Sequence, residues 1–103
     1  MSARIQRLYE AGLALKGKDA TKSKTSRLFA AGRGKLAKKL GEEAMEVVIE
    51  AVKGDRQKVI HESADLLYHL VMVWADLGIP PKEIWKEMDQ REAQRGIAEK
   101  TKP

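Results

Sequence analysis

The sequence contains no cysteine, only three prolines and only 5% aromatic residues. Without cysteine the chain can form no disulfide, no thiolate metal site and no cysteine nucleophile. Its best apolar stretch, residues 66–77, is interrupted by His69 and Asp76, and a membrane-spanning helix needs about 18 consecutive apolar residues. Residues 1–16 likewise lack the unbroken apolar segment of a signal peptide. We therefore expect a cytoplasmic protein with no membrane partner.

Length and charge limit the ligands that suit this chain. A chain of 103 residues is long enough for one domain, but a domain of this size buries only about two-thirds of its unfolded surface. The 20 Lys and Arg residues exceed the 15 Asp and Glu residues, which leaves a net charge of +5. Such a surplus favours polyanionic ligands, such as phosphate groups or nucleic acid.

Apolar residues recur at helical spacing along almost the whole chain, and no alternating pattern indicates a strand. We therefore predict an all-α fold of four to five helices in a single domain, residues 1–95, followed by a flexible tail, 96–103. Ser2 and Asp55 are expected N-caps, and Gly54 and Gly78 are expected to end helices. The predicted segments are a first helix from residue 3 to about 17, a mobile loop at 17–26, a short turn at 26–31, and helices at 35–53, 56–77 and 81–95.

Five acidic residues fall into two short groups on the two long predicted helices. Glu42, Glu43 and Glu46 share a face of the first helix, and Glu62 and Asp65 share a face of the next. A solvated surface would be the simplest explanation, but like charges at i,i+4 destabilise a helix by about 0.2 to 0.5 kcal/mol each unless a cation lies nearby. Antiparallel helices would make the two groups face each other, as in the metal sites of helical bundles. Oxygen ligands alone indicate Mg²⁺ or Mn²⁺.

Basic residues near the first acidic group suggest what a metal would act on. Lys35 and Lys39 precede Glu43 on the same helix face, and Lys39 could contact phosphate or pair with Glu43. Arg27 and Arg33 are further candidates to contact phosphate. Protein-bound Mg²⁺ commonly joins carboxylates to substrate phosphates. The pattern therefore favours hydrolysis of a phosphoanhydride, with release of pyrophosphate.

The strings "GKLAKKLGEEAMEVVIEA" and "HESADLLYHL" resemble the acidic signature of the all-α MazG-like nucleoside triphosphate pyrophosphohydrolases. Together with "RLYE" and "SRLFAAG", they are most similar to the phosphoribosyl-ATP pyrophosphohydrolase family of histidine biosynthesis, over residues 4–95. The resemblance implies Mg²⁺-dependent hydrolysis of phosphoribosyl-ATP to phosphoribosyl-AMP and pyrophosphate by a homodimer with sites at or near the subunit interface. It assigns the metal to Glu43, Glu46, Glu62 and Asp65, and makes Glu42 the candidate that orients or deprotonates the water.

Three other interpretations stay open. A MazG-like enzyme for a different nucleoside triphosphate would carry the same acids. A basic helical module that binds nucleic acid would explain the positive charge but not the acidic groups, so no nucleic-acid partner is expected. A purely structural dimerisation module would explain the apolar helices. The two long helices are apolar over so much of their circumference that we expect a homodimer in any case.

Overall fold

The computed structural model describes residues 2–95, and they form five helices: α1 (Ala3–Leu15), α2 (Lys24–Ala30), α3 (Arg33–Lys53), α4 (Arg56–Leu77) and α5 (Pro81–Arg95). Within this part of the chain there is no strand, which confirms the predicted all-α fold. None of these helices is both long enough and apolar enough to cross a membrane. The predicted flexible tail, 96–103, lies outside the described residues.

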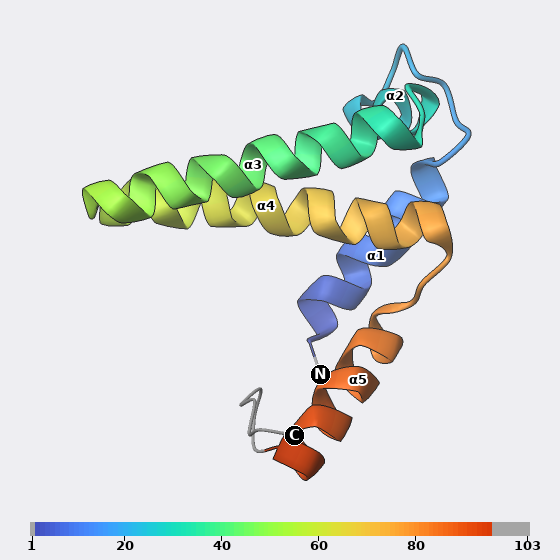
Figure 1. Cartoon of the computed structure of the whole chain (residues 1–103). Coiled ribbons are helices and arrows are strands. Elements are labelled where there is room, and N and C mark those ends of the chain that lie inside the picture. The colour runs from blue at the N-terminus through green and yellow to red at the C-terminus, as the bar shows by residue number, and fades with distance from the viewer. Residues whose placement is uncertain (1, 96–103) are drawn as a thin grey trace.

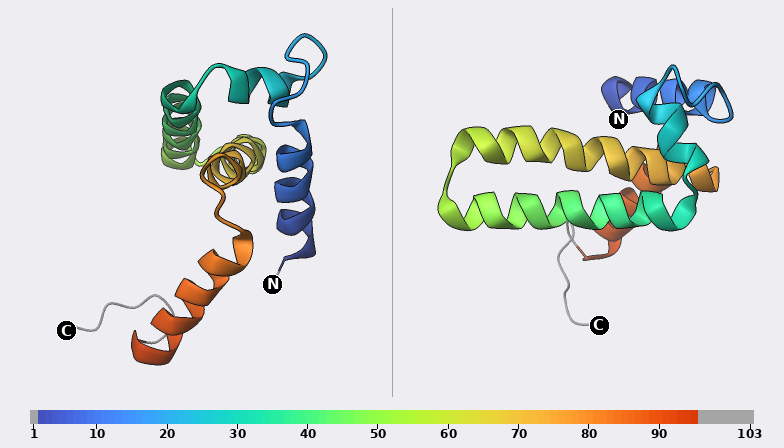
Figure 2. Two further views of the ribbon diagram at one scale, coloured as in Figure 1. Left: turned by 90° about the vertical axis from the view of Figure 1, so that its right-hand side faces the viewer. Right: turned by 90° about the horizontal axis from the view of Figure 1, so that it is seen from above.

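The long helices α3 and α4 form an antiparallel hairpin that dominates the molecule (Figure 1). Helix α1 packs across α4, and the short α2 joins α1 to the start of α3. Helix α5 leaves the end of α4 in a different direction and contacts α1 (Figure 2). The half of the hairpin near its turn extends beyond the other described helices (Figure 1, and the right-hand view of Figure 2).

Capping residues set most of the helix ends. The Ser2 side chain accepts a hydrogen bond from Ile5 N, and the Asp55 side chain accepts one from Lys58 N. Gly54 and Gly78 have φ angles of 71° and 70°, and they end α3 and α4 in the left-handed conformation that glycine adopts without steric cost. The prediction for these four positions is confirmed.

The region before α3 differs from the prediction. Residues 24–26 were assigned to a loop but form the first turn of α2, because the Ser23 side chain accepts a hydrogen bond from Ser26 N and thereby caps the helix. Helix α1 ends at Leu15 rather than near Gly17. Helix α3 begins at Arg33, two residues earlier than expected. The predicted bounds of α4 and α5 agree with the structure.

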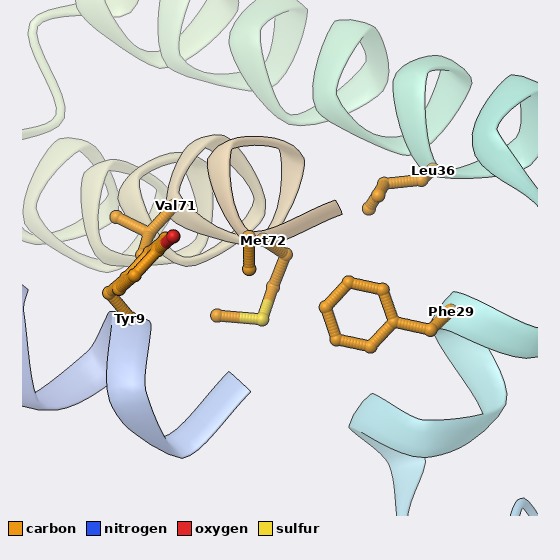
Figure 3. Close-up of a cluster of buried hydrophobic side chains, with 6 residues drawn as sticks. Tyr9, Phe29, Leu36, Val71 and Met72 are labelled. Carbon is orange, nitrogen blue, oxygen red and sulfur yellow. The ribbon is translucent and has the colours of Figure 1, made fainter. Parts of the chain in front are cut away.

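The hydrophobic core lies at one end of the hairpin, where α1, α2, α3 and α4 meet (Figure 3). Val71 and Met72 of α4 are fully buried there, and Leu36 of α3 is almost fully buried. Tyr9 from α1 and Phe29 from α2 complete the cluster. Helix α5 is joined to α4 by an edge-to-face contact between Trp74 and Trp85, whose ring centroids are 6.2 Å apart. This core holds the first turns of α3 in place against α4.

Gly12 allows α1 to approach α4 closely. A Cβ atom at this position would lie 2.7 Å from both Sδ and Cε of Met72, and 3.8 Å from Cβ of Ala75. Because Met72 is fully buried, its thioether cannot move out of the way into solvent. The glycine is therefore favoured by packing rather than by backbone conformation, and α1 continues through it to Leu15.

We expect Gly12→Ala to destabilise the protein by about 1 kcal/mol. Crowding a packed core costs about 1 to 3 kcal/mol, and the better helix propensity of alanine offsets roughly 0.5 to 1 kcal/mol of that cost. Gly41→Ala is the matched control, because Gly41 is also inside a helix, but apart from the adjoining residues and backbone of its own helix nothing lies within 4 Å of the added Cβ. Urea unfolding should show Gly12→Ala less stable, and Gly41→Ala slightly more stable, than the unsubstituted protein. A Gly12→Ala variant as stable as the control would contradict the packing argument.

Candidate metal and phosphate site

Two facing turns of the hairpin bring the predicted acids together. Because α3 and α4 run antiparallel from the turn at Gly54, residues before the turn lie opposite residues at a similar distance after it. Glu43, Glu46 and Glu62 each offer a carboxylate oxygen, and these oxygens lie within 4.8 Å of one another. Glu62 also forms such a group with Asp65 and His61. We call Glu43, Glu46, Glu62 and Asp65 the acidic cluster.

The carboxylates of the acidic cluster repel one another, and the effect is seen at Glu62. Partial desolvation, followed by the negative charges of Glu46, Glu43 and Asp65, raises the pKa of the Glu62 carboxyl above its ordinary value, and His61 acts in the opposite direction. Like charges at this spacing are stabilised by a cation between them. The donor set of the acidic cluster consists of carboxylate oxygens on exposed or partly exposed side chains, which suits a hard divalent ion such as Mg²⁺ or Mn²⁺.

A cleft of about 300 Å³ adjoins the acidic cluster. Glu43 and Asp65 belong to both, because they line the cleft as well. Four cationic side chains line its walls, together with His69 and the apolar side chains of Leu28 and Ala31; the four are Lys24, Arg27, Lys35 and Lys39. A cleft with carboxylates and cations on its walls can hold a metal ion and the phosphate groups that bind to it.

Glu42 lies outside the close group of carboxylates. Its side chain is 47% exposed, and one of its oxygens is 3.5 Å from the Nζ atom of Lys39. Lys39 lines the cleft, whereas Glu42 does not, so the ion pair places Glu42 directly behind one of the residues of the cleft wall. Lys39 therefore pairs with Glu42 at i,i+3, rather than with Glu43 at i,i+4 as one interpretation had it.

The two predicted arginines differ in their surroundings. Arg27 lines the cleft and donates a hydrogen bond to the carbonyl oxygen of Ala20, 2.9 Å away. Arg33, in contrast, is not among the residues that line the cleft, and its Nε donates to Asp76 at 2.7 Å. Lys16 also pairs with Asp76, at 3.5 Å. Asp76 thus joins the ends of α1 and α4 to the start of α3, and a contact between Arg33 and phosphate stays a prediction.

The ion pairs of Asp76 should make stability depend on pH. The hydrogen bond from Arg33, followed by the charge of Lys16, lowers the pKa of Asp76 below its ordinary value. A lowered pKa stabilises the fold at pH values above the unfolded pKa of about 3.9, and this stabilisation is lost as pH falls through the folded pKa.

We therefore expect Asp76→Asn to cost roughly 0.5 to 1 kcal/mol at pH 7, because its two cationic partners are largely exposed and screened. The difference from the unsubstituted protein should shrink as the pH approaches 3. Asp89→Asn is the matched control, since Asp89 is exposed and forms no ion pair with the described residues. Chemical denaturation across this pH range checks the prediction. A deficit that stays constant with pH would contradict it.

Sequence reasoning did not assign two residues near the acidic cluster. His61 Nε2 lies 3.6 Å from Asp65, and the imidazole is among the groups that could hold a metal with Glu62 and Asp65. The spacing of four residues between His61 and Asp65 on a helix was the available signal. Lys24 lines the cleft but was placed in the loop, because the start of α2 was not recognised.

Comparison with known proteins identifies the family. A sequence model of the family described as "Phosphoribosyl-ATP pyrophosphohydrolase" matches residues 7–92. The chain therefore belongs to this family, and it is an enzyme. It is 55% identical over 100 residues to "Phosphoribosyl-ATP pyrophosphatase 2" of Rhodopseudomonas palustris, covering 97% of this chain and 76% of that protein. It is 52% identical over 99 residues to "Phosphoribosyl-ATP pyrophosphatase" of Azospirillum brasilense, covering 96% of this chain and 89% of that protein.

Proposed function

We propose that this enzyme hydrolyses the α–β phosphoanhydride of phosphoribosyl-ATP in the presence of Mg²⁺, releasing phosphoribosyl-AMP and pyrophosphate in the second step of histidine biosynthesis. The observation that carries the proposal is that Glu43 and Asp65 line a cleft with cationic walls and also belong to the acidic cluster. A divalent ion and a polyphosphate can therefore meet at the same two side chains. The names of the relatives supply the substrate.

In this proposal each group of residues has a separate task. The acidic cluster would hold Mg²⁺, which supplies charge stabilisation at the phosphate oxygens when it is bound. Lys35, Lys39 and Arg27 neutralise the negative charge of the polyphosphate and orient it in the cleft. Glu42, at the edge of the cluster, takes the proton from the water that attacks phosphorus, and the bond from that phosphorus to the bridging oxygen breaks as pyrophosphate leaves.

The proposal is tested by steady-state kinetics with phosphoribosyl-ATP and a panel of ordinary nucleoside triphosphates. We expect kcat/KM for phosphoribosyl-ATP to exceed that for ATP by about 100-fold or more, because the second ribose phosphate adds contacts in the cleft. Chromatography should identify phosphoribosyl-AMP and pyrophosphate as the only products. Comparable rates on ordinary nucleotides would instead favour the broader MazG-like interpretation. Strongly salt-dependent binding of DNA without hydrolysis would favour the nucleic-acid interpretation.

We also propose that the enzyme is a homodimer formed through the projecting half of the α3–α4 hairpin. Large apolar side chains on α3 are solvent-exposed there: Met45 at 55%, Val48 at 52%, Ile49 at 45% and Val52 at 85%. Ile60 on α4 is 52% exposed. In Figure 1 and in the right-hand view of Figure 2, none of the other helices in residues 2–95 covers this half of the hairpin. The four α3 residues recur at i, i+3, i+4 and i+7, so they share one face of the helix, and an exposed apolar face is typical of a subunit interface.

Light scattering at micromolar concentration should give twice the mass of one 11.5 kDa chain. Val48→Glu should lower the dimer fraction by about tenfold or more, since it places a charge in an apolar interface. Met88→Glu is the matched control, because Met88 is equally exposed but lies on α5. A fully active monomer would overturn the proposal. Dissociation by Met88→Glu alone would assign the interface to α5.

A further inference from the structure

His69 is the buried polar side chain of α4 that no part of the proposed mechanism uses. It is only 5% exposed, yet it lines the same cleft as Lys39, Glu43 and Asp65. Its ring lies edge-on to the ring of Tyr68, with the centroids 4.9 Å apart. The Tyr68 hydroxyl is in turn hydrogen-bonded to the Thr25 hydroxyl on α2. The imidazole is thus held in a fixed orientation on the wall of the cleft.

One hydrogen bond determines which ring nitrogen carries the proton. His69 Nδ1 lies 2.9 Å from the backbone carbonyl oxygen of Asp65. A carbonyl oxygen can only accept, so Nδ1 must donate its hydrogen. In a neutral imidazole the other nitrogen, Nε2, then has a free lone pair and acts as an acceptor.

Nε2 is available to a ligand. Nε2 forms no hydrogen bond with the described residues. It is not one of the fully buried unpaired atoms, and the side chain lines the cleft, so a ligand in the cleft can reach it. Nε2 differs in chemistry from the other polar groups that line the cleft. The cationic side chains there can only donate hydrogen bonds, and the carboxylates suit a metal ion. Phosphate oxygens are acceptors too, so an acceptor nitrogen does not suit the polyphosphate part of a nucleotide.

We propose that His69 Nε2 accepts a hydrogen bond from a donor on the nucleoside part of the substrate, either a ribose hydroxyl or the exocyclic nitrogen of the purine. His69 thereby fixes the nucleoside one helical turn beyond Asp65 while the phosphates lie between the lysines and the acidic cluster. The inference rests on the proposed function, because it assigns a position to the nucleoside of that substrate. It makes His69 a substrate-binding residue rather than a core residue.

Two substitutions of His69 distinguish the role of Nδ1 from the role of Nε2. In His69→Asn the side-chain amide can replace Nδ1 and keep the bond to the Asp65 carbonyl, but nothing reaches the place of Nε2. In His69→Gln the longer amide can place an acceptor near Nε2 and loses the bond from Nδ1. We expect His69→Asn to raise KM by about tenfold with kcat little changed, because a donor on the bound substrate is left unpaired. We expect His69→Gln to recover most of that loss.

The experiment measures KM and kcat for phosphoribosyl-ATP, and ATP binding by calorimetry with Mg²⁺, on the unsubstituted protein and both variants. An unsubstituted protein that does not turn over phosphoribosyl-ATP contradicts the proposed function, whereas the order of ATP affinities decides the role of His69 independently. Circular dichroism and melting confirm that both variants fold. If His69→Gln binds ATP as weakly as His69→Asn, or more weakly, then Nε2 makes no such contact and the inference is wrong.

Two further nucleotides identify the donor. 2′-Deoxy-ATP lacks one ribose hydroxyl, and ITP carries an oxygen in place of the exocyclic nitrogen of adenine. The nucleotide that lacks the relevant donor should bind the unsubstituted protein about tenfold more weakly than ATP does, and it should bind His69→Asn and the unsubstituted protein equally well. If His69→Asn weakens ATP, 2′-deoxy-ATP and ITP by the same factor, the bond is to the remaining ribose hydroxyl. If it weakens none of them, the inference is wrong.

Discussion

Glu42→Gln is expected to lower kcat by about 100-fold or more while Mg²⁺ affinity stays within about threefold of the unsubstituted protein. General-base catalysis typically contributes 10² to 10⁴. The expectation follows from position, since Glu42 lies beside the acidic cluster but outside the group whose oxygens approach within 4.8 Å. Its only ion pair among the described residues is with Lys39.

Loss of the ion pair with Lys39 is the alternative cause of a slow Glu42→Gln variant, so a matched control is needed. Lys39→Met removes the same pair and also a predicted phosphate contact, and it should therefore raise KM rather than lower kcat alone. Single-turnover rates and calorimetry with Mg²⁺ distinguish the two effects. If Glu42→Gln loses metal as severely as Asp65→Asn, then Glu42 is a ligand and another group must take the proton.

Within the acidic cluster, Glu46→Gln, Glu62→Gln and Asp65→Asn are expected to lose both Mg²⁺ affinity, by about tenfold or more, and kcat. A ligand acts both in binding and in the transition state, so the two losses should accompany each other. Glu62→Gln should also remove charge repulsion, because the surrounding acids raise the pKa of that carboxyl. Its metal-free form should therefore melt no lower than the unsubstituted protein, and added Mg²⁺ should no longer raise its melting temperature.

Glu87→Gln on α5 serves as the control for these variants, because it makes the same substitution at a glutamate outside the acidic cluster. Among the described residues Glu87 pairs only with Arg91, one turn away on the same exposed helix. It should leave Mg²⁺ affinity unchanged. Calorimetric titration and thermal melting with and without Mg²⁺ provide the measurements. Unchanged affinity in all three cluster variants would show that the acids form only a charged surface.

Much of the fold could be predicted because local signals define it. Gly54 ends α3, and Asp55 and Gly78 cap the two ends of α4. Each of these caps depends only on the residues next to it in the sequence, so it can be recognised without the fold. Helix α2 was predicted only as a short turn, since it has just seven residues, begins with Lys, Thr and Ser, and has too little apolar periodicity to be recognised. It forms because Ser23 caps it and Phe29 is buried in the core.

The part of the site that depends only on residue spacing within two adjacent helices could be predicted from the sequence. Acids at a spacing of three residues on adjacent antiparallel helices must come close, and they do so at Glu43, Glu46 and Glu62. Pairs that are distant in sequence could not be predicted in this way. Arg33 and Asp76, 43 residues apart, meet only because α1, α3 and α4 pack as they do. The direction of the His69 ring likewise depends on a backbone carbonyl and on Tyr68, not on its place in a helical pattern.

Metal dependence is the most direct test of the central claim that the acidic cluster binds the ion that turnover requires. Turnover of phosphoribosyl-ATP should be measured after removal of metal with excess chelator, and again as Mg²⁺ is restored, with circular dichroism recorded in parallel. The predicted result is no detectable turnover without metal, unchanged helicity, and full recovery on addition of Mg²⁺. Full turnover in excess chelator would contradict the account.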